Sequence, residues 1–333
     1  MRILSGIQPS GSFHIGNYFA MMKKMIAYQE EQELFAFIAN LHALTSQPEG
    51  GRLAANTRDA AASFLALGLD PAKSVFWVQS DVGEVTELTW ILSNVTPVAL
   101  LERCHSYKDK VSKGIQPNHG LFAYPVLMAA DILLFQSDRV PVGQDQKQHL
   151  EVTRDIAVKF NLLYGETFTV PEPEIDDDVA VIPGTDGQKM SKSYGNTIDI
   201  FSDRETLRKQ VMGIVTDSTP VEAPKDPERC NLFAIASLFF SPEERETLAG
   251  RYRAGGLRYS EVKKDLVERI WNFFAPYREK RAALLEDPQT LDKILREGAD
   301  RARQVAVRTL NEVRRKVGLC YGGARPCFPN TKG

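Results

Sequence analysis

The sequence contains few cysteines, and their spacing does not suit a metal centre. The 333 residues include four cysteines, which are scattered and form no Cys-x-x-Cys pair: Cys104, Cys230, Cys320 and Cys327. Zinc sites and iron–sulfur clusters need several ligands at short, regular spacings. We therefore expect neither group, and the scattered cysteines favour a reduced, cytoplasmic setting.

The chain also lacks a long apolar run and a strong net charge. Its longest mostly apolar run, residues 121–135, contains Asp131 and is shorter than the roughly 20 residues that span a bilayer. We therefore expect no membrane span and, because a strand pattern begins at Ile3, no signal peptide. The formal net charge of −2 neither favours nor excludes a nucleic-acid partner.

Apolar runs that alternate with helical patterns predict a parallel sheet. The expected strands are short and continuously apolar, as in sheets buried on both faces: 3–4, 34–39, 74–78, 139–143 and 179–182. Between the last two, the acidic, proline-containing segment 172–178 is expected to be a solvated loop. The order of strands and helices indicates a Rossmann-type doubly wound α/β fold, which binds ligands at the carboxyl ends of its strands.

The patterns change along the chain and indicate two domains. A helical insertion at about 82–135 interrupts an α/β domain that covers residues 1–200. Beyond Asp203 only helical patterns occur, so residues 201–333 are expected to form an all-α domain. Residues 290–333 carry ten Lys or Arg and four Asp or Glu, which indicates either an ordinary amphipathic helix with a basic tail or a surface for RNA phosphates.

Two segments far apart in the sequence carry the residues that suit a phosphate. Residues 5–17, Ser-Gly-Ile-Gln-Pro-Ser-Gly-Ser-Phe-His-Ile-Gly-Asn, join the first strand to a helix, where backbone N–H groups and the helix dipole favour an anion. Residues 189–193, Lys-Met-Ser-Lys-Ser, put two ammonium groups on a loop after a glycine-rich approach. Either segment alone could be a tight turn or a solvated loop, whereas the pair favours binding of a polyphosphate.

These segments resemble the two motifs of class I aminoacyl-tRNA synthetases. Residues 14–17 are similar to the first motif, and residues 189–193 match the second in full. Within that class the chain resembles the bacterial tryptophanyl-tRNA synthetases almost from end to end, as also shown by residues 127–133, 140–149 and 215–218. The chain differs from the class motif at Asn17, which stands in place of a second histidine, as is usual in the tryptophanyl branch. It also differs at Leu4, where relatives often have an aromatic residue.

The resemblance implies which residues act on ATP. The catalytic residues would be His14, Asn17, Lys189 and Lys192. The wider ATP site would contain Gln8, Pro9, Ser10, Gly16, Asn17, Gly143, Gln144, Asp145, Ile182, Lys189, Met190, Ser191, Lys192 and Ser193. Asp145 would accept hydrogen bonds from the ribose, or else cap the following helix. Lys110 resembles a lysine that reaches the phosphates, and Mg²⁺ would accompany ATP.

An apolar helical stripe with one carboxylate predicts the amino-acid pocket. Tyr124, Met128, Asp131 and Phe135 share one helix face, on which an unpaired carboxylate would be costly. An internal partner could satisfy Asp131, but so could the indole of tryptophan, which has one N–H donor and no acceptor. The rest of the pocket would then be Met128, Val140 and Val142 around the ring, with Tyr124, His42 and Gln146, by resemblance, on the α-amino and carboxylate groups.

The implied function is a cytoplasmic tryptophan–tRNA ligase. It would use ATP to form tryptophanyl-adenylate and would transfer the amino acid to tRNA(Trp), with residues 201–333 binding the tRNA and the insertion contacting a second subunit of a homodimer. Three alternatives remain: a tyrosyl-tRNA synthetase, a small-molecule nucleotidylyltransferase, and a catalytically idle paralogue that senses tryptophan or binds RNA.

Overall fold

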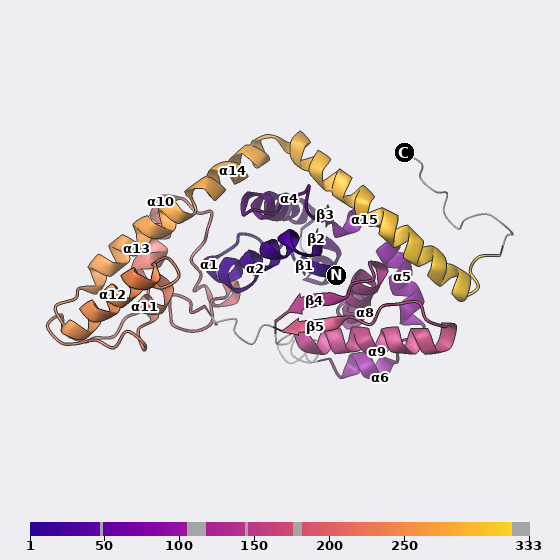
Figure 1. Cartoon of the computed structure of the whole chain (residues 1–333), viewed down its shortest axis with the longest axis horizontal. Helices are drawn as coiled ribbons and strands as arrows, with labels where there is room; N and C mark the ends of the chain where they lie inside the picture. Colours follow the sequence, from indigo (N-terminus) through magenta and orange to yellow (C-terminus); the bar gives the residue numbers. More distant parts are fainter. Residues whose placement is uncertain (47–48, 105–117, 144–145, 176–181, 322–333) are drawn as a thin grey trace.

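The computed structural model describes residues 1–46, 49–104, 118–143, 146–175 and 182–321 (Figure 1). Its centre is one sheet of five parallel strands in the order β3-β2-β1-β4-β5. The strands have these bounds: β1 (Arg2–Ile7), β2 (Glu33–Ile38), β3 (Val75–Val78), β4 (Arg139–Val142) and β5 (Glu172–Ile175). This parallel order confirms the Rossmann-type α/β fold.

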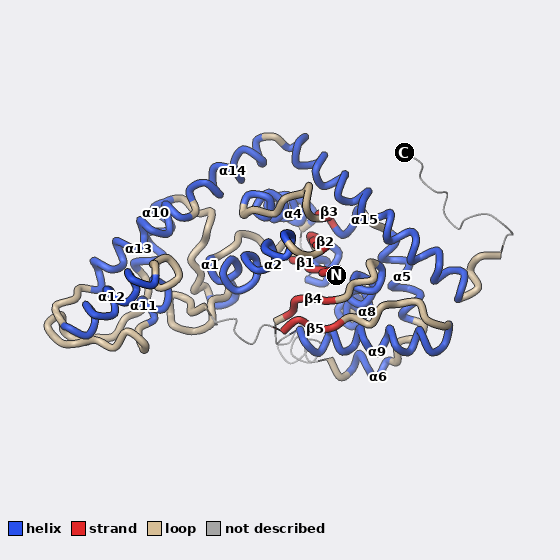
Figure 2. Tube along the Cα trace, viewed as in Figure 1, coloured by secondary structure: helices blue, strands red, loops and turns tan. Residues whose placement is uncertain are grey.

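Helices cover both faces of the sheet and continue into a helical part (Figure 2). Around the sheet they are α1 (Ile15–Asn17), α2 (Lys23–Ala27), α3 (Asn40–Ala43), α4 (Gly50–Ala66), α5 (Glu84–Ser93), α6 (Val98–Glu102), α8 (His119–Leu134) and α9 (Lys147–Tyr164). Further along they are α10 (Arg204–Met212), α11 (Asn231–Ala236), α12 (Pro242–Ala254), α13 (Tyr259–Phe273), α14 (Ala275–Glu286) and α15 (Pro288–Lys316). No helix in these described segments is long and apolar enough to cross a membrane.

The strand side chains alternate between two separate apolar layers, because successive residues of a strand point to opposite faces. Ile3 and Phe76 belong to the layer that contains residues of α4, whereas Leu4 and Trp77 belong to the layer with α5, α8 and α9. All four side chains are at least 98% buried. The sheet is therefore covered on both faces, as the apolar strand patterns indicate.

The prediction for residues 172–178 is wrong in its first half. Glu172–Ile175 forms β5, which pairs with β4 at the edge of the sheet. Proline has no backbone N–H to donate, and an edge strand tolerates Pro173 because its outer side pairs with no further strand. Its acidic residues have partners on neighbouring elements: Glu172 pairs with Arg154 at 2.7 Å, and Glu174 lies 3.6 Å from Lys24. Of the strand expected at 179–182, residues 179–181 lie outside the described residues.

The last helix does not stay with the other C-terminal helices but returns to the sheet. In Figure 1, α10–α13 form a cluster at one end, and α14 and α15 then run back over the α/β part. Arg301 of α15 donates to the carbonyls of Pro71 and Ser74 at 2.8 and 3.0 Å, and Arg314 pairs with Glu87 of α5. The domain boundary near residue 200 stays a prediction, but part of the positive charge of α15 is used to hold this helix on the sheet.

Gly298 lets α15 approach β3 closely. A Cβ atom at this position would lie 1.7 Å from the carbonyl oxygen of Phe76. Backbone atoms cannot move aside as a flexible side chain can, so any larger residue would push α15 away from the sheet edge. By contrast, Gly250 in α12 is exposed, and a Cβ there would meet nothing within 4 Å.

We therefore expect Gly298→Ala to destabilise the protein by about 1–3 kcal/mol, the usual range for overpacking, even though alanine favours a helix. The matched variant Gly250→Ala should be neutral or stabilising by up to ~1 kcal/mol, because only helix propensity changes. Thermal unfolding of both variants checks this. Equal unfolding midpoints for the two variants would show that α15 is not held closely against β3.

Candidate active site

The turn after β1 is organised by a reciprocal pair of hydrogen bonds. The Nδ1 atom of His14 accepts from the backbone N–H of Asn17, and the Asn17 side-chain oxygen accepts from the backbone N–H of His14, both at 3.2 Å. Because Nδ1 is an acceptor, the proton of the neutral ring is on Nε2. Burial and, to a smaller extent, the charge of Lys192 together lower the pKa of His14 to about 4. At neutral pH His14 is thus an uncharged donor.

The lysine loop lies directly against this turn. The backbone N–H of Ile15 donates to Ile198 at 3.0 Å, and that of Ile200 donates to Phe13 at 3.0 Å, so the chain after the loop runs beside the turn. Gly16 favours this approach, because a Cβ there would lie only 3.3 Å from the Cβ of Met190 in the loop. The two motifs, which are more than 170 residues apart in the sequence, therefore form one site.

Asn196, which the sequence reasoning missed, holds the loop in shape. This residue is 2% exposed and accepts from the backbone N–H of Ser191 at 2.8 Å. Its amide nitrogen donates to Asp186 at 2.7 Å and to the Lys189 carbonyl at 3.1 Å. An asparagine three residues after the last serine of the motif gives no periodic pattern, so only the folded loop reveals its function.

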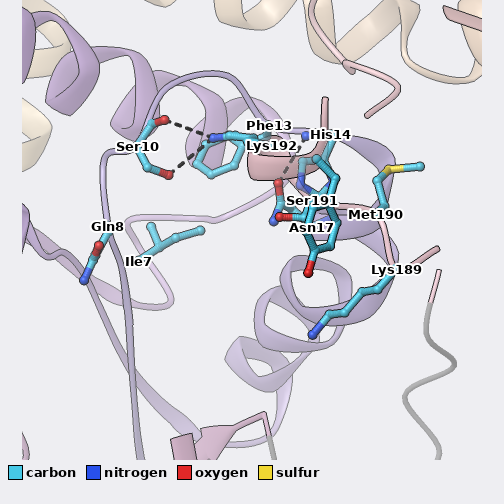
Figure 3. A pocket seen from close by; sticks show the side chains of 11 residues that line it. Ile7, Gln8, Ser10, Phe13, His14, Asn17, Lys189, Met190, Ser191 and Lys192 are labelled. Atoms are coloured by element: carbon cyan, nitrogen blue, oxygen red, sulfur yellow. Dashed lines mark hydrogen bonds between the residues drawn. The ribbon is translucent and has the colours of Figure 1, made fainter. Parts of the chain in front are cut away.

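The two lysines of the loop point in different directions (Figure 3). Lys192 Nζ donates to the carbonyl and hydroxyl oxygens of Ser10 at 3.2 and 3.3 Å and lies 5.8 Å from the centre of the Phe13 ring. Burial of part of its side chain lowers the pKa of Lys192. Lys189 extends away from Ser10 (Figure 3). The loop can therefore offer ammonium groups to two different parts of a polyphosphate.

These side chains surround a first cavity of about 510 Å³. The expected catalytic residue His14 lines it, together with seven residues of the expected ATP site: Gln8, Ser10, Asn17, Lys189, Met190, Ser191 and Lys192. Pro9, Gly16, Ile182 and Ser193 do not line this cavity. Ile182 accepts from the backbone N–H of Met190 at 2.9 Å and so supports the loop. Gln144, Asp145 and Lys110 lie outside the described residues, so their expected contacts stay predictions.

A second cavity, of about 430 Å³, contains all seven residues expected to bind the amino acid. They are Tyr124, Met128 and Asp131 from α8, Val140 and Val142 from β4, His42 from α3, and Gln146. Gly143, expected at ATP, lines this cavity instead, and Gln8 lines both cavities. The two cavities therefore adjoin at Gln8, just beyond the carboxyl end of β1, and the second cavity extends to the end of the neighbouring strand β4. This is where the strand order reverses and where such sheets bind ligands.

Asp131, which lines the second cavity, has internal partners. Its carboxylate, 3% exposed, lies 2.7 Å from Nε2 of His42 and accepts from Nε2 of Gln79 at 2.8 Å to each oxygen. Phe135, the fourth residue of the stripe, packs 4.9 Å from Trp77, centre to centre, and does not reach the cavity. The sequence analysis left an internal partner for Asp131 open but did not identify Gln79.

The described cysteines include both free thiols and a disulfide-bonded residue. Cys104 and Cys230 are free and buried, and Cys320 takes part in a disulfide bond. In the described segments no three His, Cys, Asp or Glu side chains are grouped to hold a metal ion.

Comparison with known proteins agrees with this geometry. A family model described as class I tRNA synthetases (W and Y) matches residues 1–275. The tryptophan–tRNA ligases of Campylobacter jejuni (strain RM1221) and Rhodopirellula baltica are 56% and 54% identical to this chain, and each alignment covers 96% of this chain and 100% of the relative. A crystal structure of the tryptophanyl-tRNA synthetase from Campylobacter jejuni, complexed with ADP and tryptophan, has a TM-score of 0.93 at 56% identity, and the match covers 96% of this chain and 100% of that one. The chain therefore belongs to the class I tRNA synthetases, in the branch of the tryptophan–tRNA ligases.

Proposed function

We propose that this chain activates tryptophan with ATP and transfers it to tRNA(Trp). The observation that carries this proposal is the junction of the two cavities: one presents His14, Asn17 and two lysines, and the other is apolar with a single buried carboxylate. A polyphosphate suits the first, and an amino acid with an apolar ring and one N–H donor suits the second.

In the first step an oxygen of the tryptophan carboxylate attacks the α-phosphorus of ATP, and the bond to pyrophosphate breaks. In the second step the terminal ribose hydroxyl of the tRNA attacks the carbonyl carbon of the adenylate, which releases AMP. Neither step needs a covalent bond to the protein, so the protein contributes position and charge stabilisation. Lys192, Lys189, His14 and Asn17 would donate to the phosphate oxygens, whose negative charge is redistributed as pyrophosphate leaves.

Magnesium would enter with ATP as part of the substrate. The described residues that line the first cavity offer amides, hydroxyls, an imidazole and ammonium groups but no carboxylate. Such a donor set suits phosphate oxygens and not a divalent cation, which prefers carboxylate oxygens. We therefore expect the phosphates themselves to supply the main ligands of Mg²⁺.

The identity of the amino acid depends on Asp131. Its carboxylate would accept the indole N–H, and a ring without that donor would leave the buried carboxylate short of a partner. A mismatch of this kind can discriminate by a factor of about 10⁴ or more. Tyrosine also carries a donor, so it would be excluded by the shape of the cavity around Met128 and Val142.

A second copy of the chain and the tRNA are the expected macromolecular partners. Trp90 of α5 is 72% exposed and Val98 at the start of α6 is 61% exposed, so the insertion presents apolar surface that a second copy would cover. The helices α10–α13 and the unpaired basic residues of α15 would contact tRNA in the cytoplasm. Binding through phosphates should weaken steeply as salt is added.

Pyrophosphate exchange into ATP, measured with one amino acid at a time, tests the function. We expect exchange with tryptophan and little with tyrosine or phenylalanine, because only indole suits both the apolar walls and the carboxylate. Exchange with tyrosine would keep the chemistry but contradict the assignment of the pocket. Absence of exchange with every amino acid would favour a catalytically idle protein.

Lys192→Ala should lower the rate of adenylate formation by about 10²–10³-fold, the usual loss when one donor to developing charge is removed. Tryptophan affinity without ATP should stay the same, because Lys192 does not line the amino-acid cavity. Rapid-quench kinetics and a separate binding titration measure the two quantities. Lys293 is exposed, so the control variant Lys293→Ala should change neither the rate of adenylate formation nor the affinity for tryptophan. An equal loss of rate and affinity in Lys192→Ala would exclude a role of Lys192 in charge stabilisation.

Trp90→Glu should shift the protein from dimer to monomer, because a charge would be buried without a partner at the contact. Sedimentation velocity over a range of concentrations measures the shift. Val221 is an exposed apolar residue of the helical part, so Val221→Glu is a matched change outside the insertion and should leave the oligomeric state unchanged. A Trp90→Glu protein that sediments like the parent would exclude this surface from the dimer.

A further inference from the structure

Gln79 is a fully buried polar residue that the mechanism above does not use. It begins the short helical turn η4 (Gln79–Asp81), directly after β3, and is 2% exposed. Its side chain does not line the amino-acid cavity. Both ends of its amide nevertheless form hydrogen bonds within the cluster around Asp131, so the residue connects three elements: the end of β3, α3 and α8.

The direction of the amide follows from its partners. The backbone N–H of Leu41 donates to Oε1 of Gln79 at 3.0 Å, which fixes the oxygen on the side of α3. The nitrogen must then face Asp131, where it lies 2.8 Å from each carboxylate oxygen. An amide N–H₂ group only donates, so this arrangement suits an ionised carboxylate and not a protonated one.

His42 completes the set of donors. It follows Leu41 in α3, and its Nε2 lies 2.7 Å from Oδ2 of Asp131. Gln79 therefore binds the carboxylate directly and also holds the backbone that carries the second donor. An ionised carboxylate has about four acceptor positions. The two internal donors leave capacity on Oδ1, the oxygen that His42 does not contact.

We propose that Gln79 is a positioning residue for amino-acid selection: its amide holds the Asp131 carboxylate in place so that one carboxylate oxygen accepts the indole N–H. The inference rests on the proposed contact between Asp131 and tryptophan. Burial favours the protonated form of a carboxylate, and hydrogen bonds to the ionised form oppose this. A neutral amide supplies those bonds without adding a positive charge that would compete with the substrate's own donor.

Gln79→Met tests the proposal because methionine has a similar length but no N–H donor. We expect kcat/KM for tryptophan in pyrophosphate exchange to fall by about 10–100-fold, the range for a hydrogen bond to a charged group. For 3-benzothienylalanine, in which sulfur replaces the ring N–H, kcat/KM should stay the same or rise. The preference for tryptophan over this analogue should therefore fall by at least the same factor, while KM for ATP stays unchanged.

Gln79→Glu adds a pH-dependent test of the same interaction. The introduced carboxyl would retain an acceptor for the Leu41 N–H, but in its ionised form it would repel Asp131. Burial and the neighbouring negative charge raise the pKa of such a carboxyl. Below that pKa its O–H can donate to Asp131 as the amide does. Tryptophan activity relative to the parent protein should therefore recover as the pH is lowered, whereas Gln79→Met should show no such recovery.

Ser80→Ala is the matched control. Ser80 follows Gln79, is exposed, and bonds to Asn40 at 2.8 Å and not to Asp131. We expect it to leave kcat/KM unchanged for both substrates. If Gln79→Met lowers kcat/KM equally for tryptophan and the analogue, the preference is unchanged. That result would overturn the proposal and indicate that Gln79 has a structural role only. If Gln79→Met does not fold, the pH profile of Gln79→Glu tests the proposal instead. Tryptophan activity that does not change with pH relative to the parent protein would then overturn the proposal.

Asp131→Asn separates this inference from the function on which it rests. An unchanged preference for tryptophan in Asp131→Asn would remove the proposed contact with indole, and the inference about Gln79 would be lost with it. If Asp131→Asn loses the preference but Gln79→Met and Gln79→Glu keep it, the contact stands, and only the positioning by Gln79 is overturned.

Discussion

The burial of one carboxylate constrains the amino-acid end of this protein. Asp131 lies on an apolar helix face at 3% exposure, where an ionised group is stable only if several donors reach it. Gln79 and His42 provide those donors from two other elements. The ends of β2 and β3 and the middle of α8 must therefore be placed together before the pocket can exist. The geometry of the second cavity therefore depends on the packing of the α/β part.

A second long-range constraint joins the helical part to the sheet. α15 lies along the edge strand β3, with Gly298 against the Phe76 carbonyl and Arg301 on two further carbonyls. An open strand edge exposes unpaired backbone groups, and covering it with a helix removes that liability. Part of the positive charge that distinguishes residues 290–333 therefore serves this contact. The local excess of charge in the sequence is real, but charge alone does not separate a docking helix from an RNA surface.

Features set by neighbouring residues were predictable from the sequence, whereas features set by distant partners were not. The turn at His14, the lysine loop and the helix face of Asp131 are local patterns, and the structure brings them together as two joined cavities. β5 was predicted as a loop because Pro173 and its acidic neighbours oppose a strand. Pairing with β4 and the partners Arg154 and Lys24, all distant in the sequence, reverse that preference. Gln79 carries no pattern at all. Its importance depends on Leu41 and Asp131, which its place in the sequence does not indicate.

The resting position of Lys192 shows how the phosphate end remains ready for its substrate. The ammonium group donates to the neutral oxygens of Ser10, while Asp199 and Asp59 influence its charge without a direct hydrogen bond. A hydrogen bond from an ammonium to a charged phosphate is stronger than one to a neutral carbonyl or hydroxyl. A phosphate would therefore displace Ser10 at little cost, whereas a carboxylate in direct contact would compete with it. Because His14 is neutral at neutral pH, it adds a donor without repelling this lysine, and both groups can turn toward the same phosphates.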